Sequence, residues 1–158
     1  MKYNFEELWN RLPQEIRIAC DNCEQNEKYH TEGVVTNHIK LVFEYAKKFN
    51  DIDILLAAIF HDLGKPETFA KREKNGELHI SNIGHELKCK KYIDLYFDLY
   101  SDLSDNKDKI IEICENHMKA HLYLSGNMSK KAKREAFEKL TYFNDVIKFT
   151  ECDSNGRK

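Results

Sequence analysis

A histidine and an aspartate stand side by side where a long apolar run ends. The stretch LLAAIFHDLGKPETF, residues 55–69, passes from leucine, alanine, isoleucine and phenylalanine directly into His61 and Asp62. Placing two titratable side chains at the edge of an apolar segment costs free energy unless something pairs them. The pair therefore needs a binding partner, either elsewhere in the chain or from solution.

Further side chains of metal-ligand type share apolar helix faces. They are His38, His85, His117 and Asp153. A single histidine on an apolar face is more often a hydrogen-bonded core residue, and a single aspartate at a helix end is more often a cap. Together with His61 and Asp62, however, the set is explained by one metal centre. Nitrogen and oxygen ligands without thiolate suit Mn, Fe, Co, Ni, Zn or Mg.

The elements that must position these residues are mostly helices. Apolar side chains at three- and four-residue spacing predict helices. They cover about residues 5–20 with an interruption at Pro13, then 34–49, 52–63, 84–100, 107–121, 129–140 and 142–153. Residues 54–60 are all apolar and would also suit a buried strand, but their leucines and alanines favour a central helix.

One short hairpin is expected within this helical chain. Asn75-Gly76 in KREKNGELHI, residues 71–80, is the pair that type I′ turns prefer. Asp51, Asn82 and Ser129 are candidate N-caps of the helices that follow them. The predicted fold class is therefore all-α, with one small β-hairpin insertion.

Length, charge and cysteine content limit the class of protein. The 158 residues suffice for one domain, and a net charge of -2 gives no general attraction to nucleic acid or membrane. Since neither a membrane-spanning run nor a signal peptide is evident, we expect a cytoplasmic location and no membrane partner. The five cysteines include a single CxxC, Cys20 and Cys23, which favours a reduced thiol pair over a zinc site.

His38, the pair His61-Asp62 and the late Asp153 resemble the H…HD…D signature of the HD-domain metal-dependent phosphohydrolases. AAIFHDLGKP is the most specific stretch. YHTEGVVTNHIKLV, IGHELKCKKYI and ECDSNGR are similar to blocks of the HD domain in bacterial tRNA nucleotidyltransferases and related stand-alone HD proteins. The resemblance implies a single HD domain over residues 1–158. It has a compact helical core at 29–157 and an N-terminal helical extension at 1–28.

The resemblance also implies a set of metal ligands. One divalent ion would be held by His38, His61, Asp62 and Asp153. In family members with two further histidines a second ion is present, and here His85 and His117 occupy those places, with Asp62 as the bridge. We therefore expect one or two divalent ions.

Other residues are expected to contact substrate. Lys65 either neutralises phosphate charge, with Asp62 as the other catalytic residue, or is a solvated lysine after a helix end. His121 is either an alternative ligand or a phosphate contact, and Arg157 is expected to bind substrate. His30 and Glu32 match the family block, where shaping the loop is one role open to them.

The function implied is hydrolysis of a phosphate ester by metal-activated hydroxide. The expected substrate is a nucleotide, another phosphorylated small molecule or an RNA end, cleaved as a phosphomonoester or a 2′,3′-cyclic phosphodiester. Two alternatives stay open: hydrolysis of a nucleotide polyphosphate, and a non-catalytic HD module that binds a nucleotide or partner. The basic run SKKAKRE, residues 129–135, is either a solvated helix face or a guide for an RNA end.

Overall fold

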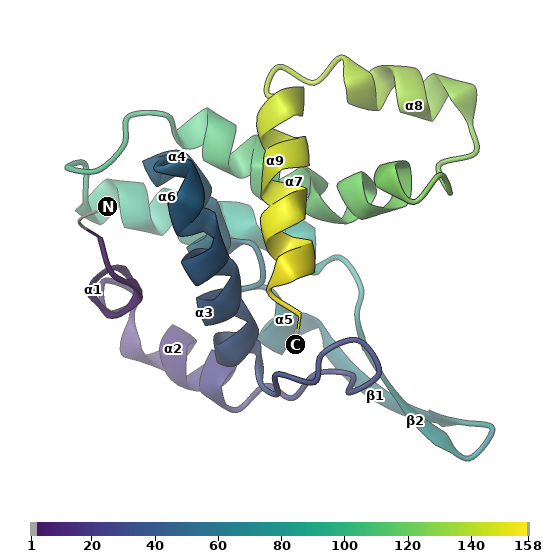
Figure 1. Ribbon diagram of the computed structural model, residues 1–158. Helices are drawn as coiled ribbons and strands as arrows, with labels where there is room; N and C mark the ends of the chain where they lie inside the picture. The colour runs from purple at the N-terminus through teal and green to yellow at the C-terminus, as the bar shows by residue number, and fades with distance from the viewer. Residues whose placement is uncertain (1–2, 158) are drawn as a thin grey trace.

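The computed structural model describes residues 3–157. Helix α4 (Ile52–Phe60) is the central helix of a helical bundle (Figure 1). It packs against α3 (Val35–Ala46), α6 (Cys89–Leu99), α7 (Lys107–Leu124) and α9 (Phe143–Asn155). Residues 54–60 are at most 1% exposed. Because this buried run is helical, the predicted central helix is confirmed and a buried strand is excluded.

Shorter elements complete the bundle. They are α1 (Phe5–Trp9), α2 (Gln14–Asp21), α5 (Lys65–Thr68), α8 (Lys131–Glu138) and the 3₁₀ turns η1 (Lys47–Phe49) and η2 (His85–Lys88). Helix α1 packs on α3 and buries Phe5, Leu8 and Trp9 against the core. Within residues 3–157, every helix is too short or too polar to cross a lipid bilayer. All five cysteines are buried with free thiols.

The predicted hairpin is present and projects from the bundle (Figure 1). Strand β1 (Phe69–Lys74) pairs antiparallel with β2 (Glu77–Asn82), so each strand is two residues longer than expected. Asn75 and Gly76 have φ angles of 54° and 78°. Those positive values are the ones a type I′ turn requires, which explains the sequence signal. Most hairpin side chains are exposed, so the hairpin adds little to the core.

Two of the three predicted helix caps are wrong. Asp51 does cap α4, because its side chain accepts a hydrogen bond from the Asp53 amide at 2.9 Å. Asn82 instead ends β2 and donates its side-chain amide to the Lys65 carbonyl at 2.9 Å. Before α8 the cap position is Lys130, and the Ser129 carbonyl accepts from Arg134 at 2.7 Å. The Asn82 side chain thus takes a tertiary partner in place of a cap, and α8 begins one residue later than a Ser129 cap would require.

Candidate metal centre

The six ligand-type residues come from five separate elements and converge on one buried point. His38 lies in α3, His61 and Asp62 follow α4, His85 opens η2, His117 lies in α7 and Asp153 lies in α9. All six are at most 4% exposed. The apolar run of α4 thus carries His61 and Asp62 into the interior, where the other helices bring their own polar groups.

Two of the histidines form what we call the inner pair. The Nε2 atoms of His38 and His61 lie 3.4 Å apart. Asp153 Oδ1 lies 2.9 Å from the first and 3.5 Å from the second. Asp62 Oδ2 lies 3.3 Å and 3.2 Å from the same two atoms. Two imidazoles and two carboxylates therefore surround one small volume.

The other two histidines form the outer pair. The Nε2 atoms of His85 and His117 lie 3.2 Å apart. Asp62 Oδ1 is 3.1 Å from His85 and 3.4 Å from His117. Asp62 thus presents one carboxylate oxygen to each pair, which is the arrangement a bridging carboxylate requires.

The backbone determines which ring nitrogen of each histidine faces the centre. Nδ1 lies 2.7 Å from the Ala58 carbonyl in His61, 2.8 Å from the Asn82 carbonyl in His85 and 2.6 Å from the Cys114 carbonyl in His117. A carbonyl can only accept, so we assign the proton of each neutral ring to Nδ1 and the lone pair to Nε2.

The donor set fits a divalent cation. In the neutral rings, Nε2 lone pairs face one another at 3.2 Å and 3.4 Å, with carboxylate oxygens beside them. Such a collection of lone pairs repels itself unless a positive charge lies among them. Imidazole and carboxylate ligands suit Zn, Mn, Fe, Co or Ni, and His38, His61 and Asp62, or Asp62, His85 and His117, could each hold one ion.

The charges within the cluster perturb its pKa values strongly. Burial opposes protonation of His61, but Asp62 and Asp153 outweigh it and raise the pKa of His61 to about 10. Burial also opposes ionisation of Asp62, yet His61 and Lys65 lower its pKa well below the ordinary value. For His117 burial prevails over Asp62 and lowers the pKa. A proton on His61 therefore takes the place that a metal ion would take.

Lys65 is buried beside Asp62. Its Nζ lies 3.2 Å from Asp62 Oδ2 and donates to Gln25 Oε1 at 2.8 Å. The interpretation of Lys65 as a solvated lysine is therefore wrong. No sequence pattern pointed to Gln25, because it lies in an irregular segment without periodicity.

His121 and Arg157 lie on the far oxygen of Asp153. His121 Nε2 is 2.6 Å from Asp153 Oδ2, and Arg157 Nη2 is 3.9 Å from the same oxygen. The Arg157 nitrogen also lies 3.5 Å from His121 Nε2. Both residues therefore contact the ligand set from one side and do not lie between the two pairs.

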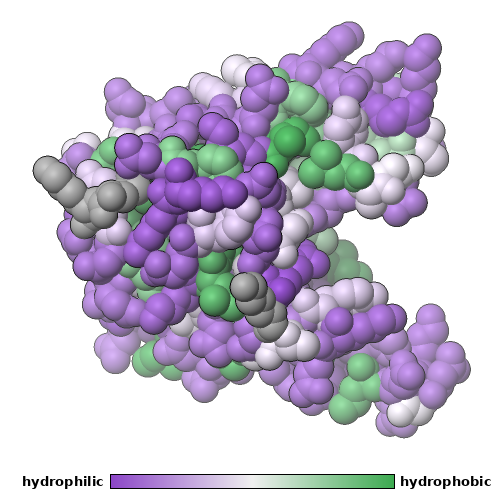
Figure 2. All heavy atoms as spheres, viewed as in Figure 1, coloured by the Kyte–Doolittle hydropathy of each residue, from purple (hydrophilic) through white to green (hydrophobic). Residues whose placement is uncertain are grey.

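A cavity of about 420 Å³ opens over the outer pair. Asp62, His85, His117 and Asp153 line it, together with Lys65 and Arg157. Its apolar lining was not predicted and comes from Tyr29, Ile80, Ile83 and Met118. Figure 2 shows the surface hollowed between the hairpin and the part that carries α8. The cavity combines an acidic and imidazole floor with cations and apolar walls.

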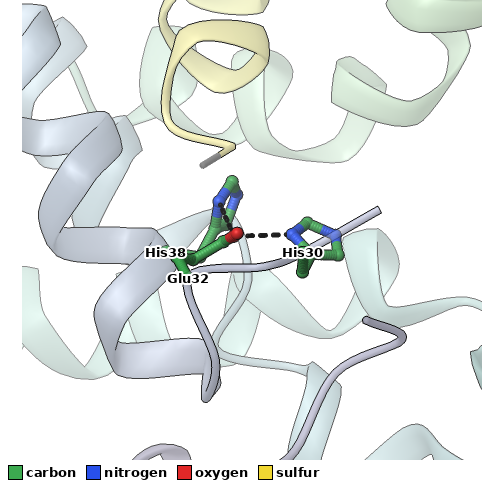
Figure 3. A group of neighbouring side chains, drawn as sticks. All are labelled: His30, Glu32 and His38. Carbon is green, nitrogen blue, oxygen red and sulfur yellow. Dashed lines mark hydrogen bonds and ion pairs between the residues drawn. The ribbon is translucent and has the colours of Figure 1, made fainter. Parts of the chain in front are cut away.

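Glu32 joins two histidines behind the inner pair (Figure 3). Its Oε1 lies 2.7 Å from His30 Nδ1 and 3.0 Å from His38 Nδ1. The Gly156 carbonyl lies 3.0 Å from the same His38 nitrogen. Burial opposes ionisation of Glu32, but the hydrogen bonds from His38 and His30 lower its pKa to about 2. Burial and the charge of Lys65 lower the pKa of His30 to about 4.

Comparison with known proteins identifies relatives of most of the chain. The family profile described as HD domain matches residues 29–143. A multifunctional CCA protein of Herminiimonas arsenicoxydans is 28% identical over 138 residues, and one of Methylobacillus flagellatus is 30% identical over 142 residues. Each alignment covers 84% of this chain and 32% of the relative. The chain thus spans about a third of the length of the curated relatives it matches.

Proposed function

The chain belongs to the HD domain family of metal-dependent phosphohydrolases, and on that premise we propose that it hydrolyses a phosphate ester of a nucleotide or an RNA end. The observation that supports this most is Asp62. Its two oxygens face two separate histidine pairs at the floor of a cavity. A phosphate in that cavity would lie over the outer pair and beside Asp62, which connects the outer pair to the inner one.

We assign the metal-ligand role to the two pairs and the two aspartates. His38, His61, Asp62 and Asp153 would hold one ion, and Asp62, His85 and His117 a second. A divalent ion there supplies Lewis acidity and a source of hydroxide near neutral pH. The lowered pKa of Asp62 and of Asp153 keeps both carboxylates ionised and able to bind a cation over the whole ordinary pH range.

Two cations of the chain would bind the phosphate itself. The Lys65 ammonium and the Arg157 guanidinium both line the cavity. Charge-assisted hydrogen bonds from such groups stabilise the negative charge that develops as a phosphate ester is cleaved. Lys65 is held by Asp62 and Gln25, so its charge is fixed in place before substrate arrives.

The nucleotide part of the proposal has two supports. The cavity volume of about 420 Å³ lies in the range of small-molecule sites. Its apolar walls, which include Tyr29 and Met118, suit the flat face of a base beside a phosphate. The similarity to relatives named multifunctional CCA proteins also favours an RNA or nucleotide substrate.

The test is a metal-dependent activity screen. Purified protein is first analysed for bound metal and then supplied with Mn, Ni, Co, Zn or Mg. Substrates are p-nitrophenyl phosphate, adenosine 2′- and 3′-monophosphate, 2′,3′-cyclic AMP and GTP. We expect hydrolysis of a monophosphate or cyclic phosphate that EDTA abolishes. GTP cleavage alone would favour the polyphosphate alternative, and absence of both metal and hydrolysis would contradict the proposal.

A matched pair of variants separates the site from the rest of the protein. Asp62→Ala removes the shared carboxylate, whereas Asp98→Ala removes an exposed carboxylate on α6. We expect the first to abolish metal-dependent hydrolysis and the second to leave it unchanged.

A further inference from the structure

Glu32 fixes the orientation of His30 as firmly as that of His38. The Glu32 side chain is 2% exposed, and a single oxygen, Oε1, serves both rings. Within residues 3–157, its other oxygen is buried without a hydrogen-bond partner. A buried carboxylate placed in this way carries a cost that some ordered function must offset. Holding His38 explains only half of the arrangement.

The other half of the arrangement is His30. Its Nδ1 is taken by Glu32, and Figure 3 shows its second ring nitrogen on the side facing away from Glu32. We find no hydrogen bond to that Nε2 atom from the part of the chain the structure describes. His30 lines the cavity of about 420 Å³ over the outer pair and also an adjoining cavity of about 540 Å³. The ring is thus held at the junction of two cavities with one nitrogen unused.

The chemistry of the pair decides what that nitrogen can bind. A carboxylate only accepts hydrogen bonds, so the proton of the neutral ring lies on Nδ1. Nε2 then carries a lone pair and must accept a hydrogen bond from its ligand. A fully ionised phosphate has no proton to donate, and the phosphate already has Lys65 and Arg157 in the same cavity. The group that fits His30 is a hydroxyl close to the phosphate.

We propose that His30, positioned by Glu32, selects ligands with a hydroxyl next to the phosphate ester, as in a ribonucleotide, over the deoxy analogue. The inference rests on the proposed function, since it places the phosphate at the two histidine pairs. A site built around a hydroxyl binds a ligand that lacks it less tightly, because the acceptor that the ligand covers is then left unpaired. His30 thereby becomes a specificity-determining residue.

The experiment measures binding, so that it does not depend on turnover. Isothermal titration of the Mn-loaded protein compares adenosine 3′-monophosphate with 2′-deoxyadenosine 3′-monophosphate, and chromatography checks that each ligand stays intact. We expect the ribonucleotide to bind about tenfold more tightly, the effect of one hydrogen bond. His30→Asn keeps an amide donor for Glu32 but has no Nε2, so it should lose the preference through weaker ribonucleotide binding alone.

Two further variants make the result specific. His30→Gln carries an amide oxygen that reaches the Nε2 position and should restore part of the preference. His79→Asn makes the same substitution as the test variant on the exposed hairpin and should change nothing. Circular dichroism and metal content confirm that each variant is folded and loaded.

Equal affinity of the wild type for both ligands, no binding of either, or equal weakening of both by His30→Asn would each overturn the inference. The last result would mean that the ring contacts water or the phosphate instead. Hydrolysis is followed in parallel samples. Ribonucleotide preference without hydrolysis would contradict the proposed function and still support the role of His30.

Discussion

The inner and outer histidine pairs are built from the same parts but differ in charge and access. At its Nε2 atoms the inner pair has two carboxylates, Asp62 and Asp153, whereas within residues 3–157 the Nε2 atoms of the outer pair have only their share of Asp62. The outer histidines line the cavity, and the inner ones do not. On the proposed metal assignment, we expect the inner pair to retain a cation and the outer pair to exchange one or to share it with substrate.

The largest effect is expected from a substitution that affects both histidine pairs. Among the residues that the structure describes, Asp62 is the group that contacts both pairs, so both should lose metal together in Asp62→Ala. The transition state of hydrolysis would lose several kcal/mol of stabilisation, which corresponds to a decrease of about 10³-fold or more in the rate. Metal content by mass spectrometry and initial rates measure the two effects. A folded Asp62→Ala protein with full activity would show that the site is assigned wrongly.

A smaller effect should separate the two pairs. His117→Gln removes one outer ligand, and His38→Gln removes one inner ligand. We expect His117→Gln to keep one tightly bound ion. His38→Gln should lower the affinity of the remaining ligands for metal by about 10²-fold. Titration with Mn, followed by equilibrium dialysis, gives the number of bound ions and their affinity. Identical losses in both variants would mean that the pairs bind one ion jointly.

Each pair also depends on a glycine that permits close approach. A Cβ at Gly64 would clash with the His85 carbonyl, and a Cβ at Gly156 would clash with Val42. Gly64→Ala should therefore displace the outer pair and Gly156→Ala the inner one. Each should lower the free energy of unfolding by about 1–3 kcal/mol. Urea unfolding measures this, with the exposed Ser101→Ala as control. A neutral result for either glycine would contradict the packing.

The smallest effect, counted per single pH unit, concerns protons. The pKa of His61 is raised to about 10, so its ring is protonated at pH 7 until a metal ion displaces the proton. The apparent metal affinity should then rise by about tenfold per pH unit between about pH 7 and pH 10. Burial lowers the pKa of His117, so the outer pair should release few protons when it binds metal.

Calorimetry in two buffers of different ionisation enthalpy counts the released protons. His117→Gln should release as many protons as the wild type at the first binding event. Release that disappears in His117→Gln would assign the proton to the outer pair instead.

The predicted elements and site residues differed in how local their signals were. The apolar run of α4 and Asn75-Gly76 carry their own periodicity and turn chemistry, and both expectations were confirmed. Asn82 and Ser129 were predicted as caps from residue type alone, but Asn82 donates to the distant Lys65 carbonyl and α8 begins after Lys130. The burial of Lys65 depends on Gln25, which lies 40 residues away. Similarly, the contact of Glu32 with two rings exists only once the loop has folded, so no spacing could predict it.

The hydrogen bond between His38 and Asp153 joins residues 115 positions apart. During synthesis, the first inner ligand leaves the ribosome long before the carboxylate that completes its set. At ordinary elongation rates of about 5–20 residues per second, several seconds separate the two events. Until α9 docks, the nascent chain lacks the Asp153 carboxylate of the inner pair, so the proposed metal centre is complete only after nearly all of its supporting helices have formed.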